Sequence, residues 1–303
     1  MIQYRILGKS DQKVSSIGMG CVTFGREIDQ PTSFEVMDHA LEQGITLFDT
    51  AEAYAGGASE MVLGQWIVQR KVRDQIVLAT KVDGTLTRQR VISSAEESLK
   101  RLQTDRIDLF QLHSWDDQTP LEETLEALTT LVEQGKIRSI GCSNWSAWHV
   151  CKALILIQQQ GLARLESVQP PYNLVQREIE DDMLPLCADQ GVGVISYSPL
   201  AAGFLTGKYR QGQETPKGTR FDVIPKHQSI YFTHHGYDTL RQLETLAEQT
   251  GRSMVQLALA WILGQANITS VLIGARYTAQ IDQALEAAEV KLDQEFPLGT
   301  KEP

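Results

Sequence analysis

Short apolar segments alternate along most of the chain with segments whose apolar residues recur every three or four positions. Several of the short segments are apolar at nearly every position and rich in β-branched residues, which is typical of strands covered on both faces. We therefore predict eight strands, over residues 15–21, 45–49, 76–82, 107–113, 139–144, 165–169, 192–197 and 270–275.

The segments between these strands predict amphipathic helices. In one of them, the apolar residues Val91, Ala95, Leu99 and Leu102 recur at helical spacing and so share one face. Glycine tolerates the left-handed conformation that ends many helices. Three helices are expected to end at a glycine within an EQG or DQG triplet: Gly44, Gly135 and Gly191.

Two helix starts carry the pattern of a capping box, in which a threonine and a glutamate three residues later each satisfy a free backbone N–H. The pairs are Thr32 with Glu35 and Thr119 with Glu122. Pro120 would then stand at the first helical position, where its missing N–H costs nothing.

Eight strands that alternate with helices, without a low-complexity linker, predict one domain over residues 1–303, built as a (β/α)8 TIM barrel. A doubly wound open sheet is the alternative. Residues 2–14 are expected to form an N-terminal β-hairpin before the first barrel strand. Residues 203–236 form a long loop after the seventh strand, and loops of that length on the active-site face of a barrel are often functional.

Composition narrows the function. The chain is 42% hydrophobic and carries a formal net charge of −10, which argues against a nucleic-acid surface. No apolar stretch approaches the roughly 20 residues that span a bilayer, and the charged N-terminus does not resemble a signal peptide. The four cysteines show no metal-finger spacing, so we expect reduced thiols, no metal site and a cytoplasmic location.

Polar residues of distinct chemistry stand where predicted strands end. Asp49, Lys81 and His113 end three consecutive strands, and Tyr54 follows Asp49 by five residues. Each taken alone is equally well explained as a solvated or hydrogen-bonded residue of a loop. Together they suit one mechanism, because the ends of parallel barrel strands meet on one rim.

In that mechanism a carboxylate holds the lysine ammonium in place. The ammonium is expected to lower the pKa of the nearby tyrosine from its ordinary value of about 10. Such a phenol can donate a proton to a carbonyl oxygen while hydride arrives at the carbon. A neighbouring histidine can orient the carbonyl.

Seven motifs occur in the order and spacing of the aldo-keto reductases: FDTAEAY, LATK, QLH, GCSN, VQPPYNL, YSPLAAGFLTGKY and IGAR. The chain resembles this family over essentially its whole length. The resemblance implies a (β/α)8 barrel and NADPH-dependent reduction of small-molecule aldehydes and ketones. It maps the catalytic tetrad onto Asp49, Tyr54, Lys81 and His113, with Tyr54 as the general acid.

The resemblance also implies residues that bind NADPH. Ser143, Asn144 and Gln169 match the group that bonds the nicotinamide carboxamide, and Tyr197 matches the ring that stacks on the nicotinamide. The pyrophosphate and adenosine ends would be held by Ser198, Leu200, Gly203, Lys208, Gly274, Arg276 and Gln280. A guanidinium suits a 2′-phosphate, so Arg276 favours NADPH over NADH.

Trp115 follows a predicted strand end and is expected to line the substrate pocket, together with Phe24. Two departures from the family pattern bear on binding: Cys21-Val22 stands where many relatives have Thr-Trp, and Ala284 stands where relatives often have Asn. The first implies a less bulky wall on the substrate side, and the second implies the loss of one adenine contact.

Two other functions compete with carbonyl reduction. A regulatory, channel-associated relative would keep the barrel and cofactor but turn over slowly. A Schiff-base aldolase would use Lys81 as a neutral amine, whereas Asp49 and Tyr54 would keep it charged. The sequence leaves the substrate and the oligomeric state open, and a monomer suffices for every site residue named above.

Overall fold

The eight predicted strands close into a parallel barrel in the order β10-β3-β4-β5-β6-β7-β8-β9. The structure is a computed structural model that describes residues 2–292; residues 1 and 293–303 of the expected domain lie outside the described range. The strands are β3 (Ile17–Gly20), β4 (Leu47–Asp49), β5 (Val77–Val82), β6 (Ile107–Leu112), β7 (Ile137–Ser143), β8 (Leu165–Gln169), β9 (Gly193–Ser196) and β10 (Ser270–Ile273). Pairing of β10 with β3 closes the sheet and rules out the open alternative.

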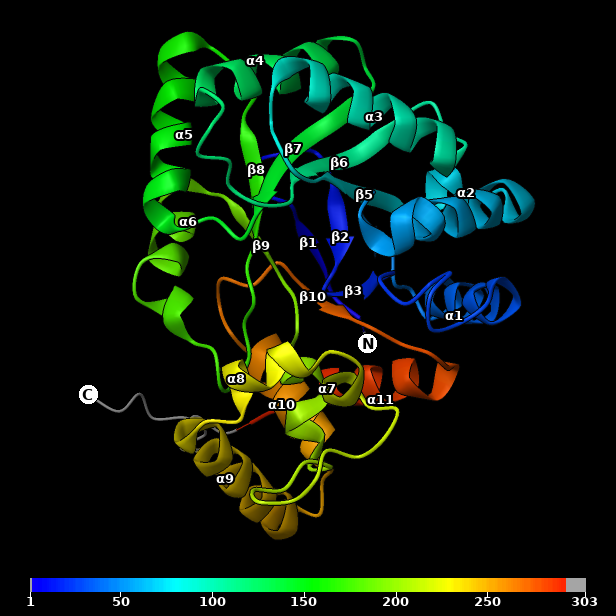
Figure 1. The fold of residues 1–303 in the computed structure, drawn as a ribbon, viewed down its shortest axis with the longest axis vertical. Coiled ribbons are helices and arrows are strands. Elements are labelled where there is room, and N and C mark those ends of the chain that lie inside the picture. The colour runs from blue at the N-terminus through cyan, green and yellow to red at the C-terminus, as the bar shows by residue number, and fades with distance from the viewer. Residues whose placement is uncertain (1, 293–303) are drawn as a thin grey trace.

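Helices surround the barrel (Figure 1). They are α1 (Gln30–Glu42), α2 (Ala58–Arg70), α3 (Arg88–Leu102), α4 (Leu121–Glu133), α5 (Ala147–Gln160), α6 (Met183–Gln190), α7 (Arg220–Val223), α8 (Gln228–Tyr231), α9 (His234–Thr250), α10 (Met254–Leu263) and α11 (Thr278–Ala288). Short 3-10 turns join them: η1 (Tyr54–Gly57), η2 (Arg73–Gln75), η3 (Glu178–Glu180), η4 (Ala201–Thr206) and η5 (Pro225–His227). No helix within residues 2–292 is both long and apolar enough to cross a bilayer.

Both predicted capping boxes are wrong. At the first helix an aspartate is the N-cap in place of the threonine, and before the second helix the threonine bonds an aspartate and does not cap the helix. Helix α1 is capped by Asp29, whose carboxylate accepts the Thr32 N–H at 3.0 Å. Thr119 instead donates its hydroxyl to Asp116 at 2.6 Å. Pro120 is the N-cap of α4, and the helix begins one residue later.

The glycine helix ends are confirmed. Gly44, Gly135 and Gly191 have φ values of 88°, 69° and 67°. These values lie in the left-handed region, where a residue with a Cβ would be strained.

As predicted, an antiparallel hairpin, formed by β1 (Tyr4–Ile6) and β2 (Lys13–Ser15), precedes the first barrel strand. Leu7, which follows β1, and Val14 of β2 belong to a buried apolar cluster with the barrel residue Leu109. The side-chain amide of Gln12 donates to Ser139 Oγ at 2.7 Å inside the barrel. The hairpin therefore forms the floor of the barrel.

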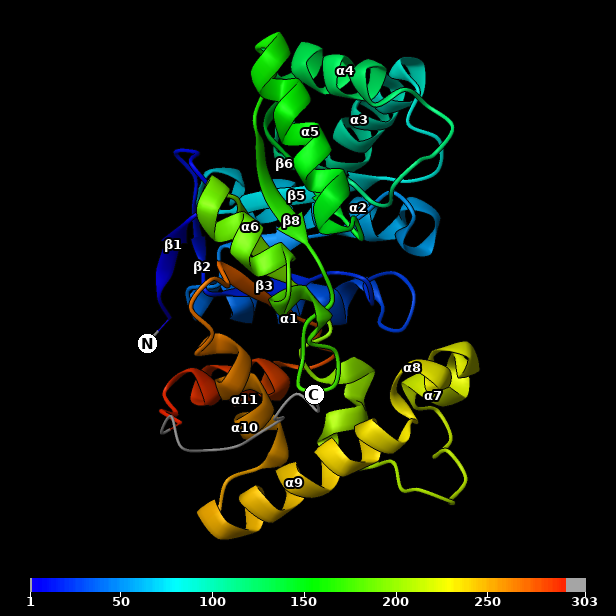
Figure 2. The same cartoon turned by 90° about the vertical axis from the view of Figure 1, so that its left-hand side faces the viewer.

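The long connection over residues 203–236, which we call the strap, is folded rather than irregular. It contains α7, η5 and α8, and Figure 2 shows these helices on the side of the barrel opposite the hairpin. Aromatic rings pack it together: Phe221 lies 4.8 Å from Tyr209 and 5.0 Å from Phe232 between ring centroids. The strap thus lies at the mouth of the barrel.

The period of the strands sets which residues reach the mouth. Leu47, Ala79 and Leu109 belong to one buried apolar cluster of the barrel. Residues two positions apart share a face of a strand. The next such positions are polar yet buried, and lie one layer closer to the mouth: Asp49, Lys81 and Gln111.

Candidate active site

A buried lysine connects two residues of the predicted tetrad. Lys81 Nζ donates to Asp49 Oδ2 at 2.5 Å and to the Thr50 carbonyl at 2.8 Å. The Tyr54 hydroxyl lies 3.4 Å from the same nitrogen. Because the Lys81 side chain has no exposed surface, its charge is balanced by these groups rather than by water.

The turn after β4 places Tyr54 over this pair. The Tyr54 N–H donates to the Ala51 carbonyl at 3.0 Å, and the turn then passes through Ala55 and Gly56 at positive φ. The ammonium of Lys81 lies 5.0 Å from the centroid of the Tyr54 ring. His113, the fourth predicted residue, meets that ring edge-on at 5.8 Å between centroids. The structure therefore brings all four residues together.

Burial and charge act on the pKa values of these groups in opposite directions. Burial alone would lower the pKa of Lys81, but Asp49 and Tyr54 raise it, and the net direction is upward. For Tyr54, burial raises the pKa more than the Lys81 ammonium lowers it. The expected net lowering of the tyrosine pKa is therefore wrong in this structure.

The imidazole of His113 is held neutral at physiological pH. Burial lowers its pKa, and the nearby ammonium of Lys81 lowers it further. Its Nδ1 has no hydrogen-bond partner among the described residues. A neutral ring can orient a polar ligand without adding a second positive charge.

The four residues predicted to hold a nicotinamide lie together beside the tetrad. Gln169 donates to Asp49 Oδ1 at 2.9 Å, and the Ser143 hydroxyl donates to the Gln169 carbonyl at 2.8 Å. Asn144 donates to the His113 carbonyl at 2.9 Å and accepts from the Tyr197 hydroxyl at 2.8 Å. Burial raises the pKa of Tyr197 to about 12, so its phenol stays protonated.

The residues predicted for the phosphate groups follow β9. Positive φ values occur at Ser198 and at the three residues that follow Leu200, namely Ala201, Ala202 and Gly203. Strained backbone of this kind tends to occur at functional sites. A Cβ placed on Gly203 would lie 3.2 Å from Lys208 Nζ, so the ammonium lies directly against this turn.

Two predicted cations converge on the same region. Burial and the guanidinium of Arg276 both lower the pKa of Lys208. The Arg276 N–H donates to the side chain of Gln280 at 2.8 Å, which ties the start of α11 to this site. Gly274, two residues before Arg276, is exposed. Two neighbouring positive charges repel one another, and an anion bound between them would stabilise both.

The sequence reasoning missed a third cation, Arg220 of α7. Burial lowers its pKa, and Arg26 and Arg276 lower it further. Its guanidinium lies 3.7 Å from the carboxylate of Glu27, which follows β3. Only its position in a long loop near the mouth could have pointed to it.

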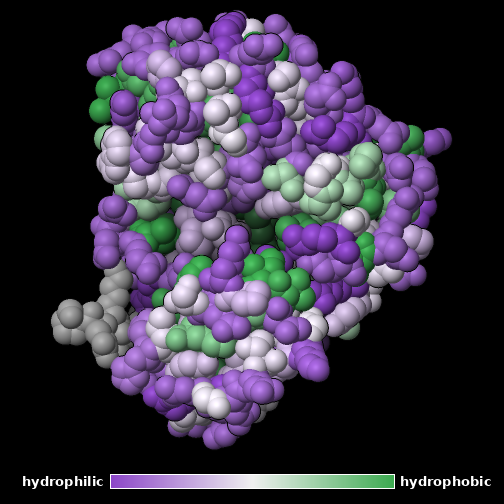
Figure 3. Space-filling view, in the orientation of Figure 1, coloured by the Kyte–Doolittle hydropathy of each residue, from purple (hydrophilic) through white to green (hydrophobic). Residues whose placement is uncertain are grey.

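The residues predicted for the substrate pocket differ in exposure. Trp115 is half-buried, and its ring stacks on His149 at 3.8 Å between centroids. Phe24 is fully buried and offers no surface to a ligand in this structure. Figure 3 shows a hollow bordered by hydrophobic side chains on the face that carries α7 and α8.

Of the residues that depart from the family pattern, Cys21 and Ala284 are buried and Val22 is half-buried. Cys21 has no exposed surface, and burial raises the pKa of its thiol, so it is a protonated group beside Asp49. Ala284 packs inside α11. The cysteines of the described chain are all free, and Cys151 is the exposed one among them.

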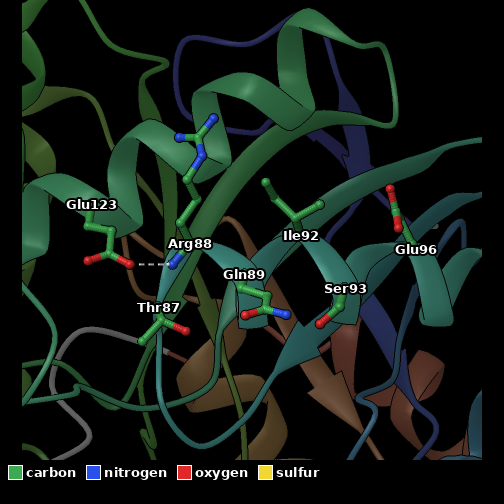
Figure 4. Close-up of a pocket in the computed structure, with 7 residues that line it drawn as sticks. All are labelled: Thr87, Arg88, Gln89, Ile92, Ser93, Glu96 and Glu123. Carbon is green, nitrogen blue, oxygen red and sulfur yellow. Dashed lines mark hydrogen bonds between the residues drawn. The ribbon is translucent and has the colours of Figure 1, made fainter.

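A separate depression lies outside the barrel, on α3 and α4 (Figure 4). There the Arg88 N–H donates to Glu123 at 2.8 Å. None of the residues that line this depression belongs to the site at the strand ends. In the part of the chain that the structure describes, no three His, Cys, Asp or Glu side chains group to hold a metal ion.

A closed (β/α)8 barrel with polar residues gathered at the carboxyl ends of its strands is the architecture of many barrel enzymes, whose active sites lie at that mouth. The Aldo/keto reductase family model matches residues 16–297, and the chain belongs to that family. The protein is therefore an NAD(P)-dependent oxidoreductase of the aldo-keto reductase type.

Relatives match over nearly the whole chain. The uncharacterized oxidoreductase YrpG and the aldo-keto reductase YhdN of Bacillus subtilis (strain 168) are each 36% identical, over 97% of this chain and over 94% and 91% of their own lengths. A probable voltage-gated potassium channel subunit beta of Arabidopsis thaliana is 34% identical, over 95% of this chain and 92% of its own.

Proposed function

We propose that the protein reduces small-molecule aldehydes or ketones to alcohols with NADPH, and that Tyr54 is the general acid. The observation that supports this most strongly is the position of Lys81 Nζ, 2.5 Å from Asp49 Oδ2 and 3.4 Å from the Tyr54 hydroxyl. This contact supplies the phenol with a fixed, charged neighbour at the barrel mouth.

Each residue of the tetrad has a distinct role in this proposal. The Tyr54 phenol is protonated at neutral pH, since burial raises its pKa, and it is placed to give its proton to a carbonyl oxygen. The Lys81 ammonium stabilises the phenolate that this leaves behind, and Asp49 keeps that ammonium charged. The neutral imidazole of His113 orients the carbonyl.

The residues present fit NADPH. The carboxamide side would be held by Ser143, Asn144 and Gln169, and the ring of Tyr197 would cover one face of the nicotinamide. Arg276, Lys208 and Arg220 offer cations for the phosphates, including a 2′-phosphate. When bound, NADPH supplies the hydride that reduces the carbonyl carbon.

A second candidate is a cofactor-binding regulatory protein with slow turnover. It is favoured by the similarity to relatives named as probable potassium channel β subunits. The Schiff-base aldolase is disfavoured, because the raised pKa of Lys81 keeps the amine charged and unable to attack a carbonyl.

The test is NADPH oxidation against a panel of aldehydes, ketones and quinones, with NADH in parallel. Tyr54→Phe should lower turnover about 100- to 10,000-fold and leave NADPH affinity close to wild type. An unchanged rate in this variant would remove Tyr54 from the role of proton donor. Tight NADPH binding by the wild type, without turnover of any compound, would favour the regulatory protein.

A further inference from the structure

Two glutamine side chains hold the carboxylate of Asp49 from the side opposite Lys81. Gln111 donates to Asp49 Oδ1 at 3.1 Å and Gln169 donates to the same oxygen at 2.9 Å. The other oxygen, Oδ2, accepts from Lys81. Gln111 thus touches the residue that holds the ammonium, and the family resemblance gave no role to it.

Gln111 occupies a position where an apolar residue would be the ordinary choice. It is fully buried on β6, and Leu109, two positions earlier on the same face, is apolar. A buried amide is unfavourable unless its hydrogen bonds are made. Here both ends of the amide are used: Nε2 reaches Asp49, and Oε1 accepts from Gln169 at 3.4 Å.

The neighbouring strand leaves room for this side chain. A Cβ placed on Gly141 of β7 would lie 3.1 Å from Gln111 Cγ and 2.5 Å from Ser167 Oγ. An alanine at this position would therefore crowd the glutamine in its bonded position. The φ of Gly141 is not in the left-handed region, so the backbone conformation does not require a glycine here. The lack of space for a Cβ is the reason for glycine at this point of β7.

We infer that Gln111 is a positioning residue, which fixes the Asp49 carboxylate and so holds the Lys81 ammonium against Tyr54. With Oδ1 held by two amides, the carboxylate cannot turn about its Cβ–Cγ bond, and Oδ2 stays directed at Lys81. The catalytic consequence rests on the proposed function, whereas the effect on the ionisation of Tyr54 does not.

The test replaces Gln111 by methionine, which keeps the length of the side chain and removes the amide. Ser167→Ala is the matched control, because Ser167 lies in the same interior and its hydroxyl has no hydrogen-bond partner among the described residues. Two quantities are measured in each variant: the kcat and KM for NADPH-dependent reduction, and the pKa of Tyr54, followed by NMR through an isotope-labelled tyrosine Cζ and assigned with Tyr54→Phe.

In Gln111→Met we expect kcat to fall about 10- to 100-fold, because small displacements of catalytic groups are costly, while KM for NADPH changes less than about twofold. The Tyr54 phenol should titrate about half a unit or more higher, since a less fixed ammonium lowers its pKa less. Ser167→Ala should match the wild type in both respects. A titration and a kcat equal to those of the wild type would overturn the inference.

The two readouts separate this inference from the proposed function. A wild-type protein that reduces no carbonyl, combined with an upward shift of the Tyr54 titration in Gln111→Met, contradicts the function and supports the inference. If Gln111→Met does not fold, Gly141→Ala in the Ser167→Ala background crowds the retained glutamine. That variant should shift the titration the same way, and an unshifted titration would overturn the inference.

Discussion

Replacement of Asp49 by asparagine removes the negative partner of an ammonium that has no access to water. Of the three contacts that Lys81 Nζ makes, the Thr50 carbonyl at 2.8 Å and the Tyr54 hydroxyl at 3.4 Å remain. A buried cation without a counter-charge is so unfavourable that it gives up its proton. We therefore expect Lys81 to be a neutral amine in folded Asp49→Asn.

The ordinary pKa of lysine sets an upper limit on the cost of that change. From an ordinary value of 10.5, loss of the proton costs about 1.4 kcal/mol per pH unit, hence about 5 kcal/mol at pH 7 and about 2 kcal/mol at pH 9. In the variant the unfolded chain binds a proton that the folded chain lacks, so its free energy of unfolding rises with pH.

The wild type lacks this dependence, because its Lys81 pKa is raised and both states keep the proton through pH 9. The stability deficit of Asp49→Asn, relative to the wild type, should therefore shrink by up to about 3 kcal/mol between pH 7 and pH 9. A deficit of the same size at both pH values would refute the reasoning.

Urea unfolding at the two pH values, followed by both far-ultraviolet circular dichroism and tryptophan fluorescence, measures these deficits where the two transitions coincide. The control is the double variant Asp49→Asn with Lys81→Met. It carries no titrating amine at this position, so its deficit should not depend on pH.

Two further predictions concern the cofactor and the helical layer. Arg276→Ala should weaken NADPH binding about tenfold or more, and NADH binding much less, in fluorescence titrations; equal losses would mean that the 2′-phosphate is held elsewhere. Gly64→Ala should lower the free energy of unfolding, measured in urea, by about 1–3 kcal/mol, because the added Cβ would lie 2.7 Å from the Leu102 carbonyl carbon in the α3 backbone. This loss is expected even though alanine favours a helix over glycine by about 1 kcal/mol. A stabilised variant would show that α2 and α3 can move apart at low cost.

The strands could be predicted because each is a short apolar run, and because side chains alternate every two residues. The same alternation placed Asp49 and Lys81 one layer above Leu47 and Ala79. Some predicted strands extended past the observed strand at the mouth, as at Asn144, which follows the last residue of β7, because the sequence pattern does not mark where the pairing ends.

What could not be predicted depends on contacts between distant segments. The net pKa shift of Tyr54 follows from burial by the folded mouth, which the spacing of Asp49 and Lys81 does not encode. Gln111 stands inside an apolar strand, and its role depends on the room left by Gly141 of the next strand. Arg220 lies in a long segment without periodicity, and the strap brings it to Glu27.

The floor hairpin has a consequence for the order of events during synthesis. Gln12 bonds Ser139, 127 residues further on, and Arg5 bonds the carbonyl of Ile268, 263 residues further on. The hairpin leaves the ribosome before every barrel strand, yet its partners come late. Contacts of such long range form slowly. The buried cluster around Leu7 and Val14 includes Leu272 of β10, so it is complete only after the last strand has emerged, and until then the nascent chain exposes apolar surface that favours aggregation.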